Sequence, residues 1–207
     1  MSDIDQPASS GILTLVRWAS WLAVAIIGVG TLAFSFWQPA GNSSSVQAAE
    51  IGGPFALTAP DGTTVTDKTL AGKPFAIFFG FTRCPDVCPT SLSRMARLRK
   101  ELGPDGMAFN IVFVSVDPEH DKPGNLGSFV ELFGTPIIGL TGTEPQLAQI
   151  KQGYKVFSAK VPQPGGDYTI DHTAAIYLMS ATGEFAGTIG YQESDAEALE
   201  KLKRLIK

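Results

Sequence analysis

The chain has 207 residues, of which 44% are hydrophobic and 17% are charged, and its formal net charge is −4. This length has room for one domain of ordinary size plus an appendage, and the negative charge disfavours a nucleic-acid partner, because such proteins present a basic face. Two cysteines are too few for a fold that is stabilised by several disulfides. Since the two lie four residues apart, they indicate redox or metal chemistry instead.

Residues 18–49 carry no charged side chain, and the stretch from Trp18 to Trp37 is almost wholly apolar. Folded as a helix, this stretch would be roughly 30 Å long, which matches the hydrocarbon core of a bilayer. Aromatic residues at its two ends are typical of membrane interfaces. Since Arg17 is the nearest basic residue, the positive-inside rule predicts that residues 1–17 are cytoplasmic and that the functional domain lies on the outer side, periplasmic or equivalent.

A cleavable signal peptide is the alternative for this segment, because the small residues at 46–49 would suit a peptidase. The apolar core of such a signal is only about 7 to 15 residues long, which favours an uncleaved transmembrane anchor at 18–37. Residues 38–52 are small and polar and are expected to form a flexible linker. Residues 53–207 are expected to form one folded domain.

The domain is expected to open with a hairpin over 55–65 that turns at Asp61 and Gly62. Beyond it, continuous apolar runs indicate buried strands, and apolar residues three and four apart indicate helices. Strands are predicted at 74–81, 109–116, 136–140, 174–179 and 184–191, and helices at 92–102, 126–133, 144–152 and 195–206. The last two strands should pair antiparallel. This order implies an α/β fold with helices on both faces of a central sheet.

Both cysteines lie where a buried strand passes into a helix. In a first helical turn, Cys84 and Cys88 would lie on one face with Cβ atoms about 5–6 Å apart, close enough to hold a soft metal ion or to form a disulfide. Backbone N–H groups at the helix start are expected to lower the pKa of both thiols. The alternative is a pair of cysteines packed in the core, which the adjoining prolines and Asp86 disfavour.

His172 precedes the strand predicted at 174–179. In a thioredoxin-like layout, the loop before this strand faces the cysteine turn. Two thiols and one imidazole would suit copper, since thiolates favour Cu(I) and nitrogen favours Cu(II). Zinc is the main inorganic competitor, but it would need a fourth ligand. A lone loop histidine without a partner is the alternative for His172.

Asp117 ends the second buried strand, at the sheet edge where α/β proteins carry their sites. It is a candidate hydrogen-bond acceptor behind the metal site, and the alternative is a turn residue before Pro118. His120, three residues further on, is expected to be exposed to solvent.

These motifs resemble those of the Sco/SenC family of copper-binding proteins that assemble cytochrome c oxidase. The resemblance runs from about Gly53 to the C-terminus, and it is densest at 79–90, 114–118 and 171–178. One departure is visible. The family pattern leads us to expect Asp-Pro-x-Arg-Asp-Thr, whereas this chain has Asp-Pro-Glu-His-Asp-Lys at 117–122, with His120 in place of the arginine and Lys122 in place of the threonine. The loss of that arginine puts partner recognition or the local charge in doubt.

The resemblance implies a thioredoxin-like fold with an extra N-terminal β-hairpin. It implies Cys84, Cys88 and His172 as copper ligands, with Asp86 and Asp117 tuning the site or contacting partners. It also implies delivery of copper to the copper-A centre of cytochrome c oxidase subunit II. Other copper chaperones and a thiol reductant are further candidate partners.

The leading hypothesis is therefore a membrane-anchored copper metallochaperone, which turns over no substrate. The alternative is a thiol–disulfide oxidoreductase that reduces the cysteines of the receiving copper site through a Cys84–Cys88 redox pair. Thioredoxins place a cis-proline opposite their cysteines, and here the sequence around His172 occupies that place, which favours metal binding. A thiol peroxidase is disfavoured, because its Thr-x-x-Cys arrangement is missing: only Arg83 separates Thr82 from Cys84.

Overall fold

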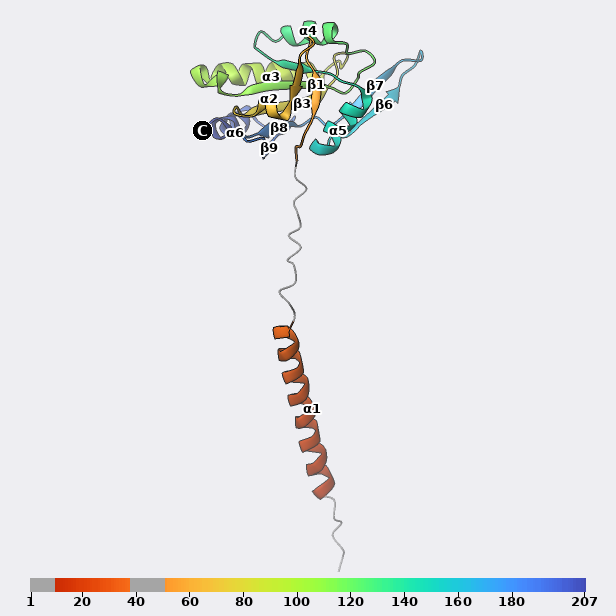
Figure 1. Cartoon of the computed structure of the whole chain (residues 1–207), viewed down its shortest axis with the longest axis vertical. Helices are drawn as coiled ribbons and strands as arrows, with labels where there is room; N and C mark the ends of the chain where they lie inside the picture. Colours follow the sequence, from red (N-terminus) through yellow and green to blue (C-terminus); the bar gives the residue numbers. More distant parts are fainter. Residues whose placement is uncertain (1–9, 38–50) are drawn as a thin grey trace, which may run out of the picture. The chain divides into compact units, whose positions relative to one another are not determined.

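The computed structural model describes residues 10–37 and 51–207, which belong to two separate compact units (Figure 1). The first unit contains helix α1 (Ser10–Trp37), which covers the predicted anchor. Within the described ranges, no helix combines the length and the apolarity needed to cross a membrane, so the transmembrane assignment of 18–37 stays a prediction. Most of the predicted linker, residues 38–50, lies outside the described residues, as do residues 1–9.

The second unit is built on a five-stranded sheet with the order β5-β4-β3-β8-β9. Its strands are β3 (Phe75–Gly80), β4 (Asn110–Ser115), β5 (Ile138–Leu140), β8 (Ile176–Met179) and β9 (Phe185–Ile189). The first three are parallel to one another, and β8 and β9 run antiparallel to their neighbours. All five strands lie within the predicted ranges. The apolar runs are clearest in β3 and β4, because a strand covered on both faces needs apolar side chains on both.

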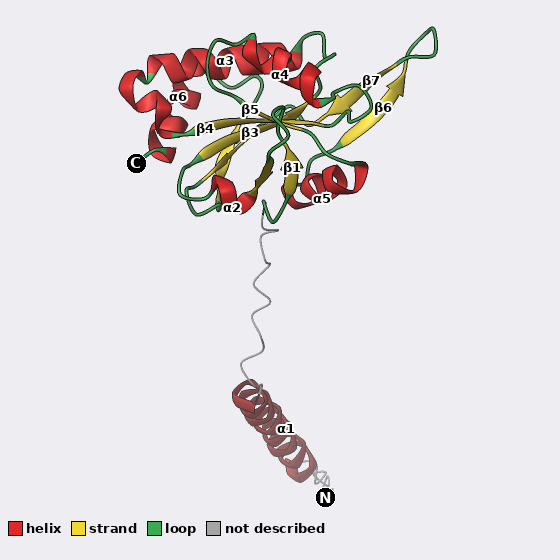
Figure 2. Cartoon of the chain, turned by 45° about the horizontal axis from the view of Figure 1, so that its top comes forward, coloured by secondary structure: helices red, strands yellow, loops and turns green. Residues whose placement is uncertain are grey.

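Helices cover both faces of this sheet, as predicted. Figure 2 shows α3, α4 and α6 on one face and α2 and α5 on the other. Their bounds are α2 (Asp67–Leu70), α3 (Val87–Glu101), α4 (Pro123–Glu131), α5 (Glu144–Tyr154) and α6 (Asp195–Leu205), with a 3-10 helix η1 at Gly103–Ala108. Because α3 and α4 each connect neighbouring parallel strands in the same direction across the sheet, right-handed crossovers place both on one face.

Two hairpins stand beside the main sheet. The predicted one pairs β1 (Ala56–Thr58) with β2 (Thr64–Thr66). A second hairpin, of β6 (Ser158–Pro162) and β7 (Tyr168–His172), is not predicted by the sequence and extends away from the rest of the domain (Figure 2). Its turn contains Gly165 and Gly166, both with positive φ, a conformation that other residues adopt only with strain.

Side chains of β3 fill the core on both faces of the sheet, and one of these faces carries the cysteines. Strand β3 is buried along its whole length, and its side chains alternate between the two faces. Phe79 packs against Tyr154 of α5, with ring centroids 5.4 Å apart. Phe78 points to the opposite face, where its ring contacts Phe113 and His172. His172 therefore lies on the face covered by α3.

Candidate metal centre

The two cysteines lie on either side of the start of α3. Cys84 sits in the turn that follows β3, where its backbone N–H donates to the Phe81 carbonyl at 3.2 Å. Cys88 is the second residue of α3, and its backbone N–H donates to the Cys84 sulfur at 3.4 Å. The pair is thus not contained in a single helical turn, as the sequence suggested, but the helix start still directs an N–H group at the outer sulfur. Neither Cys84 nor Cys88 forms a disulfide in this structure.

His172 reaches the cysteines from the last position of β7, a strand rather than the loop expected from the sequence. Its Nε2 atom lies 3.4 Å from the Cys88 sulfur, and its Nδ1 atom lies 3.0 Å from the Thr173 carbonyl oxygen. A carbonyl only accepts, so Nδ1 carries the proton, and the lone pair of a neutral imidazole at Nε2 faces the sulfurs. Edge contacts from the rings of Phe78 and Phe81 hold the imidazole in this orientation.

The structure brings the three candidate ligands together. The sulfurs of Cys84 and Cys88 and a ring nitrogen of His172 all lie within 4.8 Å of one another. Cys88 is buried, whereas Cys84 and His172 are half-buried. A soft ion placed among them would thus be held from the protein side by Cys88 and would remain reachable from the side of Cys84.

The two thiols differ strongly in acidity. A hydrogen bond from the Cys88 thiol, helped by backbone N–H groups, lowers the pKa of Cys84 to about 3, although burial opposes the shift. The same hydrogen bond retains the proton on Cys88, and together with burial it raises the pKa of that thiol far above its ordinary value. The expectation that the helix start lowers both pKa values is therefore wrong for Cys88, because that sulfur is buried and acts as the donor.

Gly80, the last residue of β3, makes room for the inner sulfur. A Cβ atom at this position would lie 2.5 Å from the Cys88 sulfur and 2.9 Å from a ring carbon of Phe113. Distances this short are not tolerated between non-bonded atoms, so only glycine leaves the sulfur where it is.

Asp121 is a buried residue of the site region that the sequence analysis missed. Its carboxylate accepts from the Thr82 backbone N–H at 2.9 Å, from the Thr82 hydroxyl at 2.6 Å and from the Ser115 hydroxyl at 2.6 Å. It therefore fixes the turn two residues before Cys84. Two signals were available, its place after the second buried strand and the second aspartate of the pattern Asp-Pro-x-Arg-Asp-Thr, but aspartate in such a turn is usually exposed.

Asp86, Asp117 and His120 lie outside the ligand set. Asp86 is exposed, and its carboxylate accepts from the Thr90 hydroxyl at 3.2 Å. Asp117 is completely buried and accepts from the Tyr168 hydroxyl at 2.7 Å. His120 is half-buried, with Nδ1 3.0 Å from Asp117, so the expectation of a freely exposed histidine is wrong. For neither Asp86 nor Asp117 does the side chain contact a candidate ligand in the hydrogen bonds of the described residues.

Known proteins are similar to this chain in sequence and in fold. The SCO1/SenC family model matches residues 43–207. The structure of Bradyrhizobium japonicum ScoI with copper bound is 45% identical, with a TM-score of 0.69, and the match covers 75% of this chain and 99% of that one. A structure of BsSco, described as a member of the Sco family of cytochrome c oxidase assembly proteins with a disulfide switch, is 25% identical, with a TM-score of 0.61, over 76% of this chain and 95% of that one.

A human relative, the mitochondrial SCO1 homolog, is 37% identical over 71% of this chain. The chain spans only 50% of the length of that relative. Together with the solved structures, these similarities confirm the predicted thioredoxin-like α/β fold.

Proposed function

The chain belongs to the SCO1/SenC family, and from this premise we propose that it is a copper metallochaperone that binds copper through Cys84, Cys88 and His172. The observation that carries the proposal is the preassembled trio, with its three ligand atoms within 4.8 Å of one another. Two sulfurs suit Cu(I), and the imidazole nitrogen extends the site to Cu(II). The copper-bound structure of a relative 45% identical supports copper over zinc.

The proposed recipient of the copper is the copper-A centre of cytochrome c oxidase subunit II. The description of BsSco as an oxidase assembly protein supports this assignment. Half-buried Cys84 would be the first ligand to be exchanged for one from the recipient, because Cys88 is buried behind it. The exposed carboxylate of Asp86, beside Cys84, is a candidate contact with that partner, whereas buried Asp117 can act only inside the domain. Transfer of copper to a soluble domain of subunit II, followed by metal analysis of both proteins, tests the assignment.

A thiol–disulfide oxidoreductase is the second candidate, and the low pKa of Cys84 favours it. With a pKa of about 3, Cys84 is a thiolate at neutral pH and half-exposed. It would attack a disulfide of the copper-receiving site, forming a mixed disulfide and releasing one partner thiolate. Cys88 would then lose its proton and attack the Cys84 sulfur, which releases the second partner thiolate and leaves a Cys84–Cys88 disulfide. The partner is reduced by two electrons and this chain is oxidised by two.

Copper binding should weaken as the pH falls from about 8 to about 5. Cys84 is already ionised in this range, since its pKa is about 3, whereas the raised pKa of Cys88 keeps its proton in place until the metal displaces it. If about one proton is released for each copper bound, the logarithm of the association constant should fall by about one for each unit by which the pH falls. Competition titrations with a chelator at several pH values measure this slope. An affinity that did not change with pH would mean that the ligand set is wrong.

Membrane anchoring is a further part of the proposal, and it is supported by the sequence. Helix α1 contains the uncharged stretch 18–37, and Trp18 and Trp21 are exposed on it. We expect the full chain to stay in the membrane pellet after alkaline extraction and the double variant Val24→Asp/Ile27→Asp to leave it, because charges are costly inside a bilayer. Mass analysis of the N-terminus separates an uncleaved anchor from a removed signal peptide. Wild-type protein in the soluble fraction with its N-terminus intact would contradict the anchor.

A further inference from the structure

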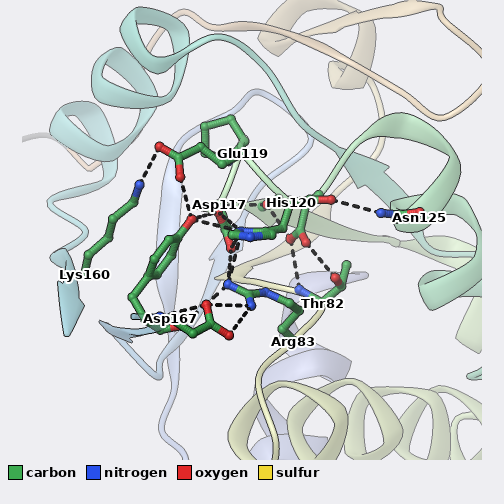
Figure 3. A network of polar contacts seen from close by, with 12 residues as sticks. Thr82, Arg83, Asp117, Glu119, His120, Asn125, Lys160 and Asp167 are labelled. Atoms are coloured by element: carbon green, nitrogen blue, oxygen red, sulfur yellow. Dashed lines mark hydrogen bonds and ion pairs between the residues drawn. The ribbon is translucent and has the colours of Figure 1, made fainter. Parts of the chain in front are cut away.

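A second polar cluster joins three segments that are distant in the sequence (Figure 3). It comprises Arg83 from the cysteine turn, Asp117, Glu119 and His120 from the loop after β4, and Lys160, Asp167 and Tyr168 from the β6–β7 hairpin. Since this hairpin carries His172 and the turn carries Cys84, the cluster connects the two halves of the candidate metal centre.

Strand β7 explains how a contact at one end of the hairpin affects the other. Side chains two apart in a strand point to the same face, so Tyr168, Ile170 and His172 all face the body of the domain. Ile170 is buried in the core, and His172 meets Cys88. Tyr168, at the other end of the strand, attaches this face of β7 to the domain, because its hydroxyl donates to the Asp117 carboxylate at 2.7 Å.

Arg83 reinforces this attachment from the cysteine side. Its Nη1 atom donates to both carboxylate oxygens of Asp167, at 3.0 and 2.9 Å, and its guanidinium lies 5.3 Å from the centre of the Tyr168 ring. The other terminal nitrogen lies 3.6 Å from the buried carboxylate of Asp117. One side chain, adjacent in sequence to Cys84, thus contacts the start of the strand that ends in His172.

The cluster also accounts for the missing arginine at position 120. The guanidinium expected there is supplied instead by Arg83, which lies 3.1 Å from His120 and faces the same buried aspartate. A buried carboxylate needs such compensation, since an unpaired charge in the interior is strongly destabilising. In this chain the compensating charge therefore comes from the residue directly before the first cysteine.

Asp117, Glu119 and His120 place carboxylate oxygens and a ring nitrogen within 4.8 Å of one another, as a metal site would. No metal ion is needed to balance their charges. Arg83 lies beside Asp117, and Lys160 pairs with Glu119 at 2.6 Å. Both carboxylates already have a cationic neighbour, so the contacts are those of a clamp between segments.

We infer that Arg83 is a positioning residue, which, together with Asp167 and Tyr168, holds the β6–β7 hairpin so that His172 stays within reach of a copper ion bound by the cysteines. This inference rests on the proposed copper site and deepens it. Loss of the clamp leaves both cysteine sulfurs in place but allows the hairpin to move. The affinity for copper then falls because the imidazole of His172 is no longer held within reach of the ion.

The test combines Asp167→Asn with Arg83→Gln in a double-mutant cycle on the full-length protein, with copper affinity measured by chelator competition. Asp167→Asn should weaken binding by about two- to fivefold, as expected for a partly exposed ion pair. Arg83→Gln should weaken it by roughly tenfold, because it also leaves buried Asp117 under-compensated. The double variant should be no weaker than Arg83→Gln alone, since both changes remove the same contact. Lys203→Gln, which removes an exposed ion pair on α6, is the matched control and should change nothing.

Two further readouts separate positioning from general destabilisation. Amide hydrogen exchange without copper should accelerate in residues 158–161 and 168–172 of both clamp variants and not in the control. Nitrogen coupling in the electron paramagnetic resonance spectrum of the Cu(II) form should diminish. Unchanged hairpin exchange and unchanged affinity in Asp167→Asn would overturn the inference. If the wild type bound no copper, the proposed function would fail, while the exchange data would still decide whether the clamp exists.

Discussion

Replacing His172 by alanine should weaken copper binding by more than about a hundredfold, since changes even to residues behind metal ligands cost about 10–100-fold. The reason is geometric: Nε2 of His172 lies 3.4 Å from the Cys88 sulfur, and its proton is held on the other side of the ring by the Thr173 carbonyl. Chelator competition measures the loss. Thiol–disulfide exchange with a small disulfide should remain within a few-fold of the wild-type rate, because it uses only the cysteines.

The matched control for this variant is Asp171→Ala. Asp171 is the preceding residue of β7, and its exposed side chain points away from the cysteines. Copper affinity should be unchanged in this control. If His172→Ala retained wild-type affinity, the chaperone assignment would be wrong and the oxidoreductase alternative would gain. Equal loss of copper binding and thiol exchange would instead indicate that the variant disrupts the cysteine turn itself.

Replacing Gly80 by alanine should either displace the Cys88 sulfur or destabilise the domain. The added methyl group would lie 2.5 Å from that sulfur and 2.9 Å from the Phe113 ring, in a closely packed region of the core. Overpacking of this kind lowers the free energy of unfolding by about 1–3 kcal/mol. Denaturant unfolding measures the destabilisation, and copper titration measures the effect on the site.

Gly124→Ala is the control for this steric argument. Gly124 lies in α4, where an added Cβ atom meets nothing within 4 Å and where φ is not in the left-handed region. This control should be neutral or slightly stabilising, because alanine reduces the entropy of the unfolded chain. If Gly80→Ala were as well tolerated as Gly124→Ala in both stability and copper binding, the close contact with Cys88 would not constrain the site.

The main sheet and its helices could be predicted because their signals are local. Strand β3 is an unbroken apolar run, and α3 ends before Gly103, which has a positive φ. The β6–β7 hairpin gives no such signal. Much of its surface is exposed, and it contains Lys160 and Pro162 in place of an apolar alternation. Its turn glycines were visible, but without flanking apolar strands they do not specify a hairpin.

The candidate ligands could be proposed from the sequence, but the interactions that support them could not. Cys84 and Cys88 form a local motif, whereas Arg83 and Asp167 meet across 84 positions of the chain. The same limit explains the error on the pKa of Cys88, since the helix start was visible and the burial of its sulfur was not. Asp121 was missed for this reason too, because its partner Thr82 lies 39 positions away in the cysteine turn.

X-ray absorption at the copper edge, on the reduced full-length protein after loading and removal of unbound metal, tests the central claim most directly. The ligand set of Cys84, Cys88 and His172 predicts about one copper per chain, bound by two sulfur atoms and one imidazole nitrogen. Prior oxidation to the Cys84–Cys88 disulfide should abolish the loading, because copper requires the thiolates. Copper retained without sulfur in its coordination shell, or loading that survives oxidation, would contradict the account.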